Sequence, residues 1–490
     1  MSYYLVLDIG TTNVKAFAYS DDVVIGTAEE RINSLFPEPG WVEEDPAEAL
    51  EKTLRVSERI IGRLGRPLGV SVTNQRSTTI LWDRETGEPL YNMITWQDTR
   101  TARIVEYFSA KFIMKLGRAF GRMARMLIEI APSLRRRPKI SYMATLAAVR
   151  FGTNHSSMHI RWLMDNVEGV KAKIESGRAM FGTLDSWIAW NLTGKHVTDY
   201  TNASATGLYD PFSLRWSDTV LKVVEIPGRI LPTPIANSQP PGTIVRGGLL
   251  EGLPLLAIIA DQQASLYSAG VSEGTVKITN GTGAFIDINV GHTPMPGGLG
   301  VFPMIALKTV EKTLYLLEGI VQTVGSAFDW LVKIGLVDDV SELSETCLKY
   351  RDTGGVSCLP ALAGLGTPHW NPEAKARFEG ITLSTERGHI VAALVKGIAL
   401  RCAEAIAALE EASGIHVDKI TADGMASNCD ALLQFIADAT GKMVEKAENL
   451  NGSSRGAYLI AKANHEGEDP VNAWAPPSIQ RRFTPSQQKI

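Results

Sequence analysis

The sequence contains little cysteine and no cysteine pattern of known function. Only four cysteines occur in 490 residues, all of them after residue 346, and none shows CxxC spacing. A disulfide framework and a zinc site are therefore not indicated, and a reducing compartment such as the cytoplasm is expected. The eight histidines also lack the spacing of metal ligands.

Long apolar runs and an export signal are missing as well. The apolar run LPLLAIIA at 253–260 is far shorter than the roughly 20 residues that cross a bilayer. No basic segment followed by an apolar core precedes the first strand-like residues. We expect a soluble protein that is not exported and has no transmembrane segment.

Neither sign of charge dominates, since the chain has 49 Lys and Arg and 53 Asp and Glu, which gives a net charge of −4. This balance gives no electrostatic reason to expect a nucleic acid as partner. No GxSxG or Cys–His pattern indicates a covalent nucleophile, and the GxxxxGK[ST] phosphate loop is absent. Length and 44% hydrophobic content favour two or more domains with a large core.

The most informative segment present is YLVLDIGTTNVKAFAY at 4–19, a strand that enters a polar turn. Gly10 can take backbone angles closed to other residues, and Asp8 can hold Mg²⁺ directly or through water. The N–H groups and hydroxyls at 11–13 can face an anion, to which Lys15 could add a cation. The alternative is a strand, a glycine turn and a second strand with no ligand, at about even odds.

A weak echo of this plan occurs at 274–291, GTVKITNGTGAFIDINVG, with strand, Gly-Thr-Gly turn and strand. Two such turns could hold the phosphates of a nucleotide from both sides. A duplicated fold used only for architecture would show the same echo.

The remaining pattern is mixed α/β. Pro-rich residues 228–241 indicate a surface connection, and a second domain is expected to open after about residue 268. The spacing predicts strands at 69–73, 78–82, near Lys419 and near Met443, a turn at 85–87, and helices at 46–64, 318–335, 389–413, 429–440 and 453–465.

Residues 111–139 are unusually basic, with nine cations against the single acid Glu129 and apolar residues interleaved at helical spacing. This predicts a basic amphipathic helix. It could bind anionic lipid, an acidic partner or a phosphorylated ligand, but a solvated basic face packed on its own domain is favoured about two to one.

Three residues at the ends of apolar runs are candidates for chemistry. Asp261, in IIADQQAS, could accept a hydroxyl proton, although in isolation a helix N-cap is favoured. Arg76 in TNQRSTT and Trp96 in ITWQDTR could bind a hydroxyl-rich ligand by hydrogen bonds and an apolar ring face. A buried ion pair beside a core Trp is about equally favoured for these two.

Several long motifs in the same order over nearly the whole chain resemble the FGGY carbohydrate kinases, and among them the glycerol kinases most. The resemblance implies two actin-like, ribonuclease-H-like domains, here expected at 1–268 and 269–490, with ATP and Mg²⁺ between them and a sugar or polyol in a deep cleft. The matching motifs are DIGTT at 8–12, FPEPGWVEEDP at 36–46, the long segment at 73–100, ADQQASL at 260–266, NGTGAF at 280–285, LAGLGTPHWNPEAKARFEGIT at 362–382 and ADGMASN at 422–428.

The resemblance also implies roles for single residues. Asp261 would be the general base and Asp8 the carboxylate associated with Mg²⁺. The acceptor pocket would be lined by Arg76, Trp96, Gln262 and Phe285. The nucleotide phosphates would meet the turn of Gly10, Thr11, Thr12, Asn13 and Lys15, with Thr282 and Gly325 approaching from the second domain.

The departures from the family pattern concern both ligands. Ser77 stands where glycerol kinases carry Glu, and Asn154 aligns with their Tyr. These smaller side chains enlarge the pocket, and a missing hydrogen bond to a hydroxyl can cost about 10⁴ in discrimination, so a bulkier polyol, ketose or cyclitol is favoured over glycerol. Near the adenosine, the family's Gln, Gly and Asn are replaced by Asp329, Met425 and Cys429.

The leading hypothesis is a Mg²⁺-dependent kinase that moves the γ-phosphoryl group of ATP to a sugar or polyol hydroxyl. Glycerol kinase proper, a non-catalytic ligand sensor that uses the basic helix, and a nucleotide hydrolase of the actin-like class are the alternatives. The resemblance makes a homodimer plausible. The acceptor itself, the base of the nucleotide and the role of 111–139 are not determined by the sequence.

Overall fold

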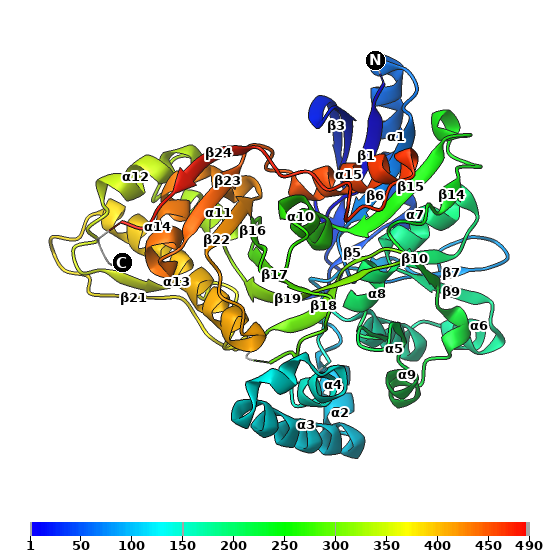
Figure 1. Ribbon diagram of the computed structural model, residues 1–490, viewed down its shortest axis with the longest axis horizontal. Helices are drawn as coiled ribbons and strands as arrows, with labels where there is room; N and C mark the ends of the chain where they lie inside the picture. Colours follow the sequence, from blue (N-terminus) through cyan, green and yellow to red (C-terminus); the bar gives the residue numbers. More distant parts are fainter. Residues whose placement is uncertain (1, 149–150, 299, 487–490) are drawn as a thin grey trace.

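Two mixed β-sheets, each covered by helices, form the body of the molecule (Figure 1). The computed structural model describes residues 2–148, 151–298 and 300–486. The first sheet has the strand order β14-β15-β6-β1-β2-β3. Its strands are β1 Tyr4–Ile9, β2 Asn13–Ser20, β3 Val23–Arg31, β6 Gly69–Asn74, β14 Gly242–Thr243 and β15 Pro254–Ala260.

The second sheet repeats this plan with the order β18-β19-β17-β16-β22-β23-β24. In each sheet an antiparallel hairpin, β1–β2 or β16–β17, adjoins two parallel strands, β6 and β15 or β22 and β23. The echo predicted from sequence is thus confirmed at the level of topology. The strands are β16 Val276–Asn280, β17 Ala284–Gly291, β18 Phe302–Lys308, β19 Thr313–Val321, β22 Lys419–Asp423, β23 Met443–Ala447 and β24 Ile479–Phe483.

Helices cover the faces of both sheets, which explains why β1, β6 and β15 are buried along almost their whole length. Part of the chain lies in short paired strands: β4 Ser34–Leu35, β5 Glu43–Glu44, β7 Ile80–Asp83, β8 Met93–Ile94, β9 Ala179–Gly182, β10 Val197–Asp199, β11 Tyr209–Asp210, β12 Arg215–Trp216, β13 Thr233–Ile235, β20 Ser357–Leu359 and β21 Arg377–Glu379. The helices are α1 Pro46–Leu64, α2 Ala102–Ala110, α3 Phe112–Ile130, α4 Pro138–Leu146, α5 Ser156–Asn166, α6 Val170–Ser176, α7 Leu184–Thr193, α8 Tyr200–Ala205, α9 Asp218–Val224, α10 Asp261–Ala269, α11 Gly325–Lys333, α12 Leu343–Lys349, α13 Arg387–Ser413, α14 Asp430–Thr440 and α15 Gly452–Glu466.

Helix α15 holds the two halves of the molecule together. Helix α15 follows the second sheet in sequence but packs on β1, β6 and β15 of the first sheet, beside α10 (Figure 1). Tyr19 of β2 stacks on Tyr458 of α15 with ring centroids 4.7 Å apart, and Arg455 forms an ion pair of 2.6 Å with Asp22. One apolar core therefore contains residues from both ends of the chain.

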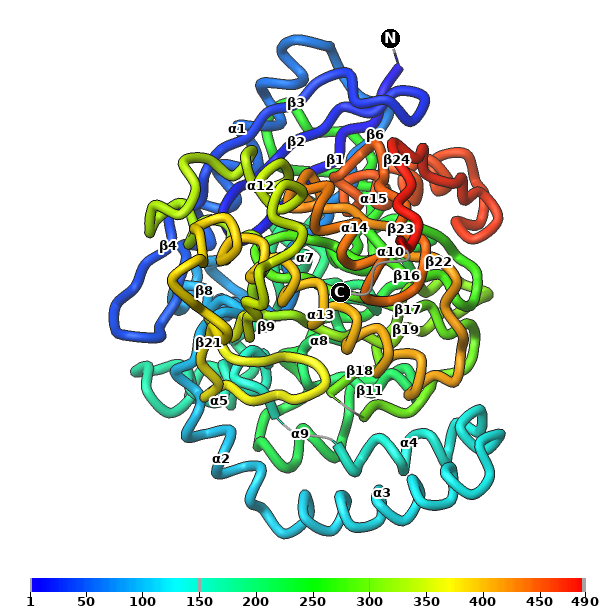
Figure 2. The backbone as a smooth tube through the Cα atoms, turned by 90° about the vertical axis from the view of Figure 1, so that its left-hand side faces the viewer, coloured from blue at the N-terminus to red at the C-terminus, as the bar shows by residue number. Residues whose placement is uncertain are grey.

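Helices α3 and α4 form a pair at the edge of the molecule, connected by the 3₁₀ turn Pro132–Arg136 (Figure 2). The basic segment is therefore not one helix, because Pro132 and Pro138 interrupt it. Arg136 forms an ion pair of 2.5 Å with Glu273, and Arg125 donates to the Gly297 carbonyl, so the pair contacts the second half of the chain. Lys111 and Arg118 also donate to the Val223 and Ser109 carbonyls of the first half. The segment thus packs on both halves of the chain, and the interpretation as a solvated basic face stays a prediction.

Most other element predictions are confirmed, including helices at 46–64, 389–413, 429–440 and 453–465. The helix expected at 318–335 is wrong in its first part. Strand β19 continues to Val321, and α11 begins only at Gly325. The segment TLYLLEGIV is buried almost throughout, and a buried apolar run has no periodicity that separates strand from helix.

No helix in the described parts of the chain is long and apolar enough to cross a membrane.

Candidate functional site

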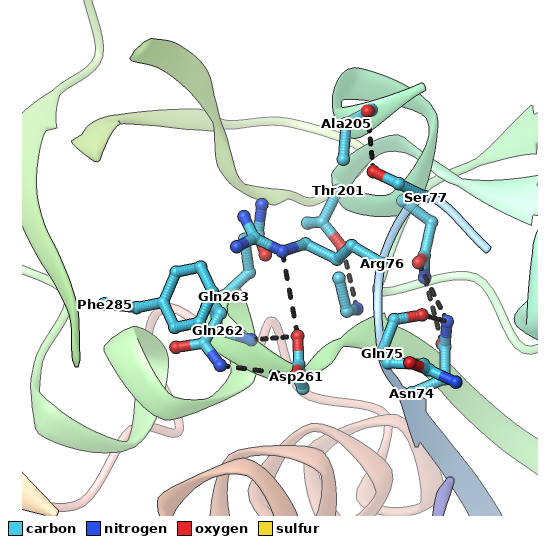
Figure 3. Close-up of polar contacts among 12 residues, drawn as sticks. Asn74, Gln75, Arg76, Ser77, Thr201, Ala205, Asp261, Gln262, Gln263 and Phe285 are labelled. Atoms are coloured by element: carbon cyan, nitrogen blue, oxygen red, sulfur yellow. Dashed lines mark hydrogen bonds and ion pairs between the residues drawn. The ribbon is translucent and has the colours of Figure 1, made fainter. Parts of the chain in front are cut away.

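Asp261 lies at the first position of α10, where β15 ends between the two halves of the chain. Its Oδ1 accepts a hydrogen bond of 2.8 Å from the Gln262 backbone N–H and lies 3.7 Å from Nε of Arg76 (Figure 3). Burial raises the pKa of the Asp261 carboxyl, and Arg76 opposes this rise. The N-cap of α10 is Ala260, so the alternative that Asp261 is only a helix cap is wrong.

Arg76 follows β6 and reaches across to the second half of the chain. Its Nη2 lies 2.8 Å from Oε2 of Glu318 on β19, and its guanidinium carbon lies 5.4 Å from the centre of the Phe285 ring. Burial lowers the pKa of Arg76, but the nearby carboxylates outweigh burial and raise it. The guanidinium is therefore a fixed cation between the acidic side chains of two domains.

Trp96 and Phe285 supply the apolar wall of the same site. Their ring centroids are 6.2 Å apart in an edge-to-face arrangement. Trp96 Nε1 donates to Oγ1 of Thr11 over 3.1 Å, and this hydroxyl donates to Oε1 of Gln75 over 2.8 Å. The aromatic side of this cluster is thus hydrogen-bonded to the turn that follows β1.

Ser77 and Asn154 do not join this group. Ser77 has a left-handed backbone conformation with φ of 65°, and its Oγ donates to the Ala205 carbonyl over 3.0 Å, away from Arg76 (Figure 3). Asn154 is exposed, one residue before His155, the N-cap of α5. The structure brings together Arg76, Trp96, Asp261, Gln262 and Phe285, and leaves these two outside.

A buried ion pair beside the site was not found from the sequence. Lys277 Nζ lies 2.9 Å from Oδ2 of Asp287 and donates to Oε1 of Gln262 over 2.6 Å. Burial also raises the pKa of Glu318 to about 7. The available signal was a single charged residue within each of the apolar strands β16, β17 and β19, which is costly unless the charge is paired.

Asp8 lies near the end of β1 and fits a Mg²⁺ ion bound together with phosphates. Its Oδ2 accepts a hydrogen bond of 2.8 Å from Oγ of Ser453. Burial raises the pKa of Asp8 to about 6, and the charge of Asp261 adds to the rise. No group of three or more possible metal ligands occurs among the described residues, whereas Mg²⁺ needs only one or two carboxylates when phosphates and waters complete its shell.

The turn after β1 places its polar groups at the surface next to Asp8. Gly10 donates its N–H to the Asn13 carbonyl over 3.0 Å, and Thr12 is exposed. Gly10 does not use the positive φ that only glycine adopts readily, so its expected conformational role is not realised. Lys15 is partly exposed, with Nζ 3.7 Å from Oε2 of Glu29.

The matching turn of the second sheet packs against the start of α11. The N–H of Gly325 donates to the Gly281 carbonyl over 2.9 Å, and the N–H of Ser326 donates to the Thr282 carbonyl over 3.1 Å. A Cβ on Gly325 would lie 2.7 Å from the Gly281 oxygen. The close approach of α11 to this turn therefore requires glycine at position 325.

The three residues expected near the adenosine have different surroundings. Met425 is 61% exposed and Asp329 is exposed, so both are accessible to a ligand. Cys429 is buried in the core of the second half, where burial raises the pKa of its thiol to about 11. It is a packed, protonated side chain.

Comparison with known proteins extends over nearly the whole chain. The N-terminal domain of the FGGY family of carbohydrate kinases matches residues 3–119 and 115–268, and the C-terminal domain matches 276–464. A protein described as an uncharacterized sugar kinase of Archaeoglobus fulgidus is 36% identical and a glycerol kinase of Alkalilimnicola ehrlichii 37% identical. These alignments cover 93% and 94% of this chain and 90% of each relative.

Among solved structures, the glycerol kinase of Plasmodium falciparum with ADP superposes with a TM-score of 0.87 at 30% identity. The match covers 99% of this chain and 94% of that one. The predicted fold class, two actin-like, ribonuclease-H-like domains, is thereby confirmed. The chain belongs to the FGGY family of carbohydrate kinases, phosphotransferases with an alcohol group as acceptor.

Proposed function

We propose that this protein transfers the γ-phosphoryl group of ATP to a hydroxyl of a sugar or polyol other than glycerol. The observation that carries the proposal is the meeting of Asp261, Arg76 and Phe285 at one point between the two sheets. A carboxylate, a fixed cation and an aromatic wall are the groups that orient a hydroxyl-rich acceptor. We assign the acceptor pocket mainly to 1–268 and the nucleotide site mainly to 269–490.

In this mechanism Asp261 accepts the proton of the attacking hydroxyl. Burial raises the pKa of the Asp261 carboxylate and makes it a stronger base, while Arg76 and the Gln262 N–H favour its ionised form. Phosphoryl transfer requires little else from side chains beyond positioning and neutralisation of charge. Closing the two domains around the acceptor would exclude water and so limit hydrolysis of ATP.

We assign Asp8 as the Mg²⁺-associated carboxylate and the turn at 10–13, with Lys15, to the phosphates. When bound, Mg²⁺ would neutralise negative charge on the phosphate oxygens. Thr282, Gly325, Asp329 and Met425 are assigned to the nucleotide from the other side of the cleft. Cys429, which is buried, would act on the nucleotide only through the packing of α14.

The position of Ser77 supports an acceptor larger than glycerol. Its hydroxyl donates to the Ala205 carbonyl, so Ser77 does not replace the carboxylate that would accept hydrogen bonds beside Arg76. Asn154 is exposed and likewise forms no contact with the grouped residues that the structure describes. A pocket without these two partners binds glycerol with fewer fixed hydrogen bonds, whereas a bulkier polyol, ketose or cyclitol fills the space.

The decisive experiment measures coupled ADP release with Mg-ATP over a panel of glycerol, tetritols, pentitols, ketoses, aldoses, cyclitols and nucleosides. We expect release that depends on one acceptor class. Asp261→Asn should lower kcat by about 10² to 10⁴ while ATP still binds. Asp418→Asn is a matched control, because Asp418 is 90% exposed and is placed outside the site.

Each other outcome has a distinct meaning. Glycerol as the best substrate would refute the interpretation of Ser77 and Asn154 but keep the kinase. ADP release without any acceptor would favour a nucleotide hydrolase. ATP binding with no turnover over the whole panel would favour a ligand sensor of the same fold. A near-normal rate for Asp261→Asn would disprove the assigned base.

A further inference from the structure

Helix α3 exposes a continuous apolar stripe on its outer side. The stripe residues recur at intervals of three and four, which places them on one helical face. Their exposed fractions run from 43% at Leu116 to 82% at Ile130. The stripe consists of Phe112, Leu116, Phe120, Met123, Leu127 and Ile130.

The opposite face of α3 fixes this orientation. Gly121, Ala124 and Ile128 are buried against the 3₁₀ turn and α4, where Ala144 completes a small core. A Cβ on Gly121 would collide with the backbone of Ala147. Rotation of α3 to bury the stripe would break this contact, so the stripe stays exposed. Figure 2 shows α3 itself at the edge of the molecule.

Cations lie beside the stripe. Lys115 and Arg122 each precede a stripe residue by one position, which places them about 100° around the helix from it. Among the described residues neither side chain has a hydrogen-bond or ion-pair partner, and the same holds for Arg137 and Lys139 after α3. Glu129 is the single acid in the segment.

We propose that α3 docks the protein on an anionic lipid surface. The stripe would enter the boundary between headgroups and acyl chains, and Lys115 and Arg122 would reach the lipid phosphates along one flank. Exposed large apolar residues flanked by cations, with no helix in the described residues able to span a membrane, are the features of an interfacial helix.

Charge argues against a second copy of this chain as the occupant of the stripe. A two-fold dimer brings the same surface of each subunit together. Lys115 and Arg122 of both copies would then gather at one interface with only Glu129 to offset them. An anionic bilayer supplies the opposite charge instead, and this complementarity selects lipid over self-association.

The test is co-sedimentation of the full chain with vesicles of phosphatidylcholine alone or mixed with phosphatidylglycerol. We expect wild type to sediment only with the anionic vesicles. Met123→Glu with Ile130→Glu should lower binding at least about tenfold, since both add charge to the inserted face. Lys115→Gln with Arg122→Gln should lower it several-fold and reduce its dependence on salt.

Leu383→Glu is the matched control, because Leu383 is fully exposed on another part of the molecule and should bind like wild type. Far-ultraviolet circular dichroism and the midpoint of thermal unfolding establish that each variant is folded. Absence of binding to either vesicle type, equal binding to both, or unchanged binding of the stripe variants would each overturn the proposal. A dimer that is lost in Met123→Glu, without vesicle binding, would assign the stripe to a second copy instead.

Discussion

At the scale of single residues, the site depends on buried carboxylates whose proton affinity the fold has raised. Burial is the largest cause of the upward pKa shift of Asp8, Asp261 and Glu318. Arg76 lies between Asp261 and Glu318 and compensates their charge. The arrangement can hold a proton or release it near neutral pH.

The raised pKa of Asp8 leads to a prediction for the pH dependence of kcat/KM. A pKa of about 6 leaves the carboxylate half protonated near pH 6. In its proposed role as a Mg²⁺ ligand, Asp8 would therefore bind the ion less tightly below that pH. The acid limb of kcat/KM should therefore move to lower pH when Mg²⁺ is raised, because the ion favours the ionised carboxylate. An acid limb that is independent of Mg²⁺ concentration would argue against Asp8 as its ligand.

Glu44 provides a test of stability against pH. Burial raises its pKa from 4.5 to about 8, and the Gln75 amide donates to its Oε2 over 3.3 Å. The folded state then binds a proton that the unfolded state has lost. The contribution of Glu44 to stability is therefore greatest at low pH and falls as pH rises from about 5 to 8, on the order of 2–4 kcal/mol.

Glu44→Gln should remove this fall and raise the stability at pH 8. The measurement is the urea midpoint of unfolding from pH 5 to pH 8 in both proteins. Glu51→Gln serves as control, because Glu51 lies on the exposed side of α1 and should keep the wild-type slope. A Glu44→Gln variant with the wild-type slope would show that other groups cause the pH dependence.

At the scale of elements, the two hairpin turns are the segments to which we assign the nucleotide. Gly325→Ala would place a Cβ 2.7 Å from the Gly281 carbonyl and push the start of α11 away from the turn at Thr282. We expect KM for ATP to rise about 5- to 50-fold, a cost of about 1–2 kcal/mol, with KM for the acceptor nearly unchanged.

Steady-state kinetics with each substrate varied in turn tests this prediction. Gly62→Ala is the matched control, since a Cβ there meets nothing within 4 Å and adds helix propensity to α1. A rise in the KM of the acceptor, with that of ATP constant, would contradict the assignment of Gly325 to the nucleotide.

At the scale of the whole molecule, the chain returns to the first sheet at α15 and goes back to the second sheet at β24, so the cut expected at 268 separates packed partners. Residues 1–268 would lose α15 from the face of β1, β6 and β15, including the stacked pair of Tyr19 and Tyr458. We therefore expect the fragment 1–268 alone to be insoluble or molten, and co-expression with 269–490 to restore a folded complex.

Gel filtration and near-ultraviolet circular dichroism of the fragment, with and without its partner, measure this outcome. As a control, 1–268 extended by a linker and residues 452–466 should gain stability, because it regains α15. A stable, cooperatively folded 1–268 fragment would show that the crossover of α15 contributes little to the first half.

The sequence by itself determined the family and the repeated strand-and-turn plan, and it singled out Asp261 and Arg76, which meet in the structure. These features are local. An apolar strand that ends in a polar turn can be recognised from consecutive residues such as Asp8 to Asn13 or Ile258 to Gln262. Ordered motifs of this kind can also be identified without knowing which residues pack against them.

Only the tertiary structure decided which side chains meet beside Asp261 and which point elsewhere. Ser77 turns to Ala205 because of its positive φ, Glu318 meets Arg76 from a strand more than 200 residues away, and α3 shows its apolar side because Gly121 packs on α4. Each outcome depends on a partner distant in sequence, and side-chain direction is set by such partners, so no local pattern could have specified it.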